Sequence, residues 1–185
     1  MEHTEAAADL RDIREIMERT RRSFADGGVG PIMIVWGVTW LLGFTGTQFL
    51  SGEAKGWVWL VLHVLAISST IVISKRAAKG VRSDIGGRIF SFWIALVVYS
   101  ALWAWILRPT AGVDAGLFIA TVAMFGWVVL GLWLSSHLFI GVGISVTILA
   151  VVGYLLLPAF FALWMALLGG GTLIGSGVYV RRCWR

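Results

Sequence analysis

The chain has 185 residues, of which 58% are hydrophobic and 14% charged, and its formal net charge is +5. A soluble domain carries about a quarter charged residues and just under half apolar ones, so this composition excludes a soluble globular domain, a disordered chain and a disulfide scaffold. The basic residues lie at the ends of long apolar segments, a distribution typical of membrane topology and not of a nucleic-acid-binding surface. The sequence therefore predicts an all-α, polytopic membrane protein.

The first 26 residues differ from the rest of the chain because charged residues are frequent in them. A stripe with alternating spacings of four and three residues, typical of an amphipathic helix, runs through Ala6, Leu10, Ile13, Met17, Thr20 and Phe24. Acidic residues crowd the early turns and Arg21 and Arg22 the last, which suits the helix dipole. We predict a cytoplasmic amphipathic helix over residues 1–26, in which Leu10, Ile13, Met17 and Phe24 bind a partner.

Three kinds of contact suit this stripe. It fits packing against the transmembrane part of the same chain or of a sister subunit, and it also fits a groove in a soluble partner protein. Lying on the membrane is the third alternative, but the segment has a net charge of −2 and anionic lipids attract it weakly. We favour packing against the chain itself or a sister subunit.

Stretches without Asp, Glu, Lys or Arg define a membrane domain over residues 27–180, and the last of them, 115–180, is 66 residues long. One helix crosses the hydrocarbon with about 20 residues, so this stretch holds three spans. Its most polar point is Ser135-Ser136-His137, and Pro158 resists the interior of a helix, so we place the divisions there. The six predicted spans are 31–50, 56–74, 89–107, 116–134, 137–157 and 158–180.

The positions of Lys and Arg predict the orientation. With six spans and a cytoplasmic N-terminus, thirteen of the fifteen basic residues lie on the cytoplasmic side. Five spans would leave the basic tail of residues 181–185 outside, so we predict both termini in the cytoplasm. The basic loop after the second span is expected to face lipid headgroups through Lys75, Arg76, Lys79 and Arg82, although topology alone also explains its charge.

Two strings resemble segments of a known group of proteins. They are Leu10-Arg11-Asp12-Ile13-Arg14-Glu15-Ile16-Met17-Glu18-Arg19 and, in the first span, Trp36-Gly37-Val38-Thr39-Trp40-Leu41-Leu42-Gly43-Phe44. Both are similar to strings in uncharacterised small bacterial membrane proteins that begin with a charged helix. The resemblance implies a location in the bacterial cytoplasmic (inner) membrane and supplies no catalytic residues. Because some members accompany winged-helix transcription regulators, it also implies a regulatory partner.

Ionisable side chains inside a membrane point to function, and only His63 and His137 qualify in the predicted spans. His63 lies about 11 Å below the outer edge of its span and His137 opens the fifth span at the cytoplasmic side, so a haem or metal ion bridging both is not expected. We expect His63 to hydrogen-bond to a neighbouring helix and His137 to be an interfacial polar residue. The spans contain no carboxylate, Lys or Arg, so we predict no cofactor, no metal site and no enzymatic activity.

Glycines are concentrated in the last two predicted spans. Gly171 and Gly175 form a GxxxG pair in the sixth, and Gly141 and Gly143 lie on the fifth. Small residues let helix backbones approach closely in lipid, so we predict that these two spans form a tight hairpin. The alternative is a helix broken at Gly169-Gly170-Gly171, as in some transporters.

The sequence favours a non-enzymatic membrane protein that acts by association with a partner protein or sister subunits, as an accessory or regulatory subunit in contact with membrane lipids. The alternative is a small oligomeric channel or transporter for a neutral or apolar solute. Its weakly polar wall groups would be Thr39, Ser68, Ser69, Thr70, Thr121, Ser145 and Thr172. A haem- or quinone-binding protein is a distant third.

Overall fold

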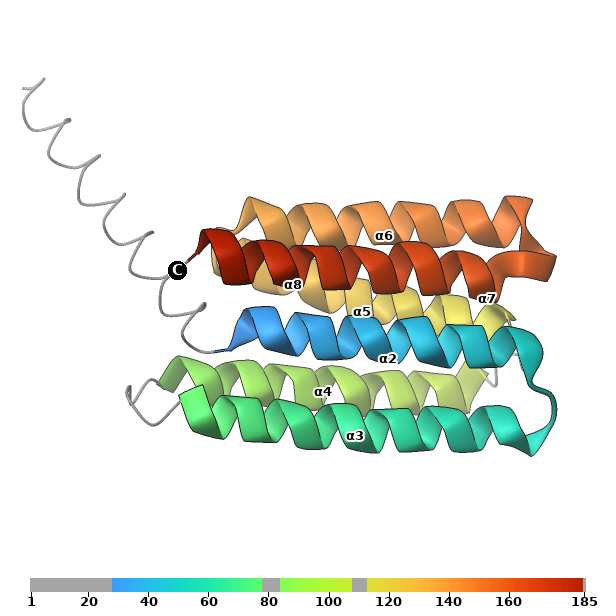
Figure 1. Cartoon of the computed structure of the whole chain (residues 1–185), viewed down its shortest axis with the longest axis horizontal. Helices are drawn as coiled ribbons and strands as arrows, with labels where there is room; N and C mark the ends of the chain where they lie inside the picture. The colour runs from blue at the N-terminus through green and yellow to red at the C-terminus, as the bar shows by residue number, and fades with distance from the viewer. Residues whose placement is uncertain (1–27, 78–83, 108–112, 185) are drawn as a thin grey trace, which may run out of the picture.

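The computed structural model describes residues 28–77, 84–107 and 113–184 (Figure 1). The predicted amphipathic helix with Leu10, Ile13, Met17 and Phe24 lies outside these ranges, as do Lys79 and Arg82. Every regular element in the described ranges is helical. The elements are α2 (Val29–Phe49), α3 (Glu53–Ala77), α4 (Asp84–Leu107), α5 (Val113–Trp133), α6 (His137–Leu156), the 3-10 helix η1 (Pro158–Phe160), α7 (Phe161–Trp164), the π-helix η2 (Met165–Gly170) and α8 (Gly171–Cys183).

Six helical segments of the described chain are long and apolar enough to cross a membrane, which confirms the all-α fold class and the six predicted spans. The long uncharged stretch divides where the sequence predicts. A turn with φ of 50° at Ser135 separates α5 from α6, and Pro158 opens the sixth span directly after Leu157. Helices α3 and α4 begin three and five residues earlier than their predicted spans, and residues 181–183 continue α8 instead of forming a separate tail.

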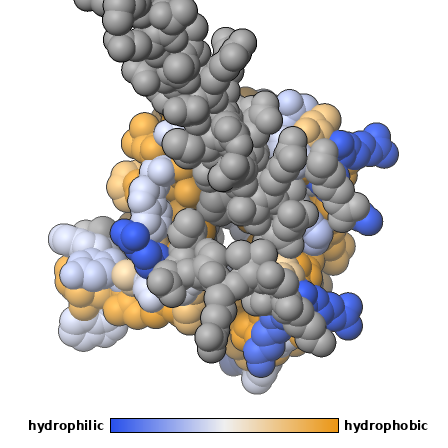
Figure 2. Space-filling model, turned by 90° about the vertical axis from the view of Figure 1, so that its left-hand side faces the viewer, coloured by the Kyte–Doolittle hydropathy of each residue, from blue (hydrophilic) through white to orange (hydrophobic). Residues whose placement is uncertain are grey.

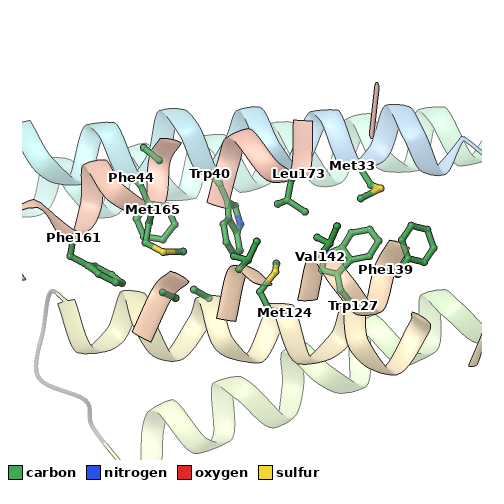
Figure 3. Packing of buried hydrophobic residues seen from close by; sticks show 14 of the residues in the cluster. Met33, Trp40, Phe44, Met124, Trp127, Phe139, Val142, Phe161, Met165 and Leu173 are labelled. Carbon is green, nitrogen blue, oxygen red and sulfur yellow. The ribbon is translucent and has the colours of Figure 1, made fainter. Parts of the chain in front are cut away.

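Four of the spans surround the hydrophobic core. The largest fully buried side chains come from α2, α5, α6 and the sixth span, and they include Met33, Met124, Phe139, Phe161 and Met165. Figure 3 shows them together with Trp40, Phe44 and Trp127, filling the space between these helices. The interior of the bundle is therefore packed with large apolar side chains.

Helices α3 and α4 lie on one side of this four-helix core, where α3 packs against α2 and α4 packs against α5 (Figure 1). Only 6% of the spanning window of α3 and 0% of that of α4 is buried, compared with 33% to 39% in the other four spans. Both helices are therefore peripheral, and most of their surface faces outward.

The sixth span changes helix type along its length. η1, α7, η2 and α8 follow one another without a break, and Gly170 and Gly171 have helical φ angles of −62° and −61°. The alternative of a helix broken at the glycine triplet is therefore wrong. Trp164 Nε1 donates a hydrogen bond of 2.7 Å to Leu149 O, which joins the start of this span to α6.

Candidate functional site

Helix α2 and the sixth span approach each other through two pairs of glycines. A Cβ added at Gly30 would lie 2.9 Å from Gly177 O, and one added at Gly37 would lie 2.8 Å from Gly170 O. Additions at Gly177 and Gly170 would in turn come within 2.6 Å and 2.9 Å of the carbonyl oxygens of Gly30 and Gly37. In each segment the two glycines are seven residues apart, which places them on one helix face. The backbones thus touch directly, as small residues allow in membrane helices.

The glycines predicted to join the fifth and sixth spans behave differently. Gly141, Gly171 and Gly175 are exposed, and a Cβ at any of them would meet no atom within 4 Å, so the predicted hairpin contact is wrong for these three. Gly143 does pack closely, but against α5, where a Cβ would lie 2.7 Å from Met124 O. Consecutive helical residues point about 100° apart, so Gly171 faces away from the side on which Gly170 contacts α2.

An aromatic cluster around His63 joins α3 to α2. The imidazole ring lies 5.7 Å from the ring of Trp36 and 5.4 Å from that of Trp59, measured between centroids. Its Nδ1 is 2.8 Å from Trp59 O, and because a carbonyl can only accept, Nδ1 carries the proton. The predicted hydrogen bond to a neighbouring helix is therefore wrong: the bond stays within α3, and the contact with α2 is aromatic.

In the same cluster, Trp59 both donates a hydrogen bond to α2 and packs closely against it. Its Nε1 donates a hydrogen bond of 2.9 Å to Thr47 Oγ1, the polar contact that links α3 to α2. Its ring lies where a side chain at Gly43 would be, 2.7 Å from the position of a Cβ. Trp59 is therefore a packing residue, unlike Trp57, which is 64% exposed near the start of the same helix.

His137 lies far from this cluster in the sequence, as the exposed first residue of α6. Within the described ranges, no three His, Cys, Asp or Glu side chains come together in a way that could hold a metal ion. His63 and His137 thus lie on different helices, and the described chain does not bring them into one site.

Basic side chains gather at one end of the bundle, which we call the basic end. Lys75 and Arg76 lie at the end of α3, Arg88 near the start of α4, and Arg181 and Arg182 at the end of α8, all of them exposed. The contact of Gly30 with Arg181 shows that α2 starts where α8 ends. Figure 2 views the molecule from this end, where groups of hydrophilic side chains alternate with apolar surface.

The basic end also carries the contact between Arg88 of α4 and Trp133 of α5. The guanidinium Cζ lies 4.9 Å from the centroid of the indole ring, within the range of a cation–π interaction. This contact, together with the packing of Trp93 and Leu96 against Gly126, joins α4 to α5.

Four of the seven weakly polar groups expected to line a solute path bond to their own helix or lie on the outer surface. The hydroxyl groups of Thr39 and Thr121 bond to backbone carbonyls of their own helices, at 2.9 Å each to Val35 O and Leu117 O. Ser68 and Ser145 are exposed on the outer surfaces of α3 and α6. Large apolar side chains fill the space between α2, α5, α6 and the sixth span, so these four groups line no passage there.

No protein-family model matches the chain, and neither a curated protein nor a solved structure is similar to it. The resemblance of residues 10–19 and 36–44 to small bacterial membrane proteins therefore stays a prediction. The function is argued below from the geometry of the described residues.

Proposed function

We propose that this chain is a non-enzymatic membrane protein that acts by association, as an accessory or regulatory subunit that binds sister subunits or a partner protein within the membrane. The observation that carries the proposal is the outward face of α4, a span of which none of the 18-residue window is buried. In lipid there is no hydrophobic force between helices, so a span is fixed in place mainly by close packing and interhelical hydrogen bonds. A span with so few contacts inside its own chain is suited to packing against another chain.

Tyr99 supports this assignment of α4. Its side chain is 66% exposed, and it has no hydrogen-bond partner among the described residues. It lies about 12 Å from the end of the 89–107 span, inside the hydrocarbon, where an unpaired hydroxyl is unfavourable. A second chain that supplies an acceptor for the phenol would remove this cost.

The proposal includes an orientation in the bacterial cytoplasmic membrane. Five described Lys and Arg residues lie at the basic end, whereas Lys55 lies near the other end, beside Glu53. The positive-inside rule then assigns the basic end and both termini to the cytoplasm. In that orientation the segment that carries Leu10, Ile13, Met17 and Phe24 belongs to the cytoplasmic side, where a soluble partner could bind it, and membrane lipids contact the outward surface of α3.

Tyr99→Phe tests the proposal because it removes one hydroxyl group and leaves the apolar surface of α4 intact. Full-length protein extracted with its native lipids should show a particle mass above that of one chain, or a copurifying protein, and Tyr99→Phe should lower that fraction. Tyr179→Phe is the matched control, since Tyr179 is 51% exposed but lies on α8. If both variants lowered that fraction equally, or neither lowered it, α4 would not be the helix that binds the second chain.

Deletion of residues 2–26 separates the two parts of the proposal. The shortened chain should insert normally yet lose the partner or the higher mass, if the N-terminal stripe takes part in binding. A single-chain particle in both proteins, with nothing copurifying, would refute association altogether. Solute leakage from vesicles that contain the full chain, absent from empty vesicles, would favour the channel alternative instead.

A further inference from the structure

A cleft at the basic end lies between α2 and α8. It has a volume of about 330 Å³ and is lined by Ile34, Val178, Arg181 and Arg182. This volume lies at the lower end of the range for small-ligand sites. Two of its lining residues, Ile34 and Val178, are apolar, and the other two are arginines.

The glycine contact between α2 and the sixth span explains why the cleft forms here. Gly30 lies against the backbone of Arg181, where an added Cβ would come within 3.2 Å of Arg181 N and 3.3 Å of its Cβ. Val178, Arg181 and Arg182 are spaced by three and four residues and therefore share one face of α8. Ile34 lies one helical turn after Gly30, on the α2 side of the same opening.

The charges around the cleft favour an anion. Glu53 is the acidic residue whose side chain the structure describes, and it lies at the end of α3 opposite to Lys75 and Arg76. Neither Arg181 nor Arg182 has a carboxylate partner within the described ranges. Guanidinium groups match phosphate oxygens in a bidentate geometry, which makes a phosphate group the natural ligand of two neighbouring arginines.

The depth of the cleft favours an anion that belongs to a lipid. Arg181 and Arg182 follow the apolar part of the sixth span and precede Trp184, while Tyr179 is exposed one turn earlier. Tyr and Trp side chains are typical of the headgroup level of a membrane. At that level the glycerol and the first carbons of an acyl chain are the apolar groups available to Ile34 and Val178.

We propose that this cleft is a binding site for the phosphate of an anionic phospholipid. Arg181 and Arg182 bind the phosphate oxygens, and Ile34 and Val178 contact the apolar part next to the headgroup. The site is separate from the α4 face proposed for association, and it needs only one chain. A lipid headgroup and free inorganic phosphate share the recognised chemistry, so the experiment must distinguish them.

Native mass spectrometry of the full chain in detergent tests the site with phosphatidylglycerol and phosphatidylcholine of identical acyl chains. The wild type should retain phosphatidylglycerol in preference to phosphatidylcholine, and R181Q/R182Q should lower that preference by about tenfold or more, the effect of losing charge-assisted hydrogen bonds. K75Q/R76Q is the matched control: Lys75 and Arg76 are expected to face lipid headgroups at the same end but do not line the cleft, so removing the same charge there should lower the preference less than R181Q/R182Q does. An equal loss in both double variants would mean general surface attraction and overturn the proposal.

Two further arms test the cleft and the source of the phosphate. Val178→Trp fills the cleft and keeps both arginines, so it should also lower retention of phosphatidylglycerol, and unchanged retention would overturn the proposal. Inorganic phosphate in excess should leave the bound lipid in place. Displacement of the lipid by phosphate alone would identify a site for free phosphate and refute the lipid assignment.

Discussion

At the scale of single residues, what surrounds a glycine decides whether it contributes to the packing of the bundle. Gly175 and Gly177 lie two positions apart in α8, yet the first faces open space and the second faces Gly30 O at 2.6 Å from the position of a Cβ. A methyl group at Gly177 must therefore push two helix backbones apart. A methyl group at Gly175 meets nothing in the described chain.

Gly177→Ala should destabilise the protein by about 1–3 kcal/mol, the usual cost of overpacking. Gly175→Ala should be neutral or slightly stabilising, because Ala is a better helix former by about 1 kcal/mol in water. Unfolding in detergent, followed by circular dichroism, compares the two variants under one condition. Equal midpoints would show that the glycine pairs do not hold α2 to the sixth span.

The hydrogen bond from Trp59 Nε1 to Thr47 Oγ1 should contribute to the stability of the α2–α3 contact. Thr47→Val keeps the shape and removes the acceptor, so it should cost about 0.5–1.5 kcal/mol, the range for polar contacts between membrane helices. Thr121→Val is the control, because the Thr121 hydroxyl bonds only to carbonyls of its own helix. The same unfolding measurement should place Thr121→Val nearer to the wild type.

At the scale of elements, the spans differ in how firmly their own chain holds them. Helix α2 contacts both α8 and α3, and α5 packs along α6, whereas α4 contacts α5 through a small patch around Gly126 and through the contact of Arg88 with Trp133. The aromatic side chains Trp93, Trp127 and Phe139 continue this patch inward, with centroid distances of 5.9 Å and 5.2 Å. The outward face of α4 is left to lipid or to another chain.

Cross-linking at this face tests the proposed association at the level of one helix. In a Cys183→Ser background, a cysteine at Val98 of α4, which is 58% exposed, should form cross-links with a second chain in native membranes. A cysteine at Ile148 of α6, which is 57% exposed, should not. Cross-links at both positions in equal yield would indicate random collision and not a defined interface.

At the scale of the whole molecule, the even number of spans brings the start of α2 and the end of α8 together at the basic end. The exposed Cys183, at the end of α8, reports which side of the membrane this end faces. In spheroplasts, a maleimide that cannot cross the membrane should leave Cys183 unlabelled. It should label a cysteine at Ser51, the exposed residue between α2 and α3, in a Cys183→Ser background. The opposite labelling pattern would invert the orientation and the cytoplasmic roles proposed for both termini.

The spans and their divisions could be predicted from the sequence because they depend on local properties. Length, hydropathy and the absence of charge define a membrane-crossing helix whatever it packs against. Pro158 and the polar residues at 135–137 likewise divide the long apolar stretch by their own chemistry. For the same reason the sequence alone predicted that His63 lies inside the second span. Its contacts could not be predicted, because they depend on which helix packs against α3.

Only the tertiary structure decided which glycines bring the helices together. Glycines occur on several faces of the sixth span, so the GxxxG spacing of Gly171 and Gly175 was as good a candidate as the wider spacing of Gly170 and Gly177. The matching seven-residue spacing of Gly30 and Gly37 was a signal that pointed to the second pair. The matching spacing brings the glycines together only when the first and last spans lie antiparallel and in register. No local property of either segment determines this pairing, because more than 130 residues of chain separate them.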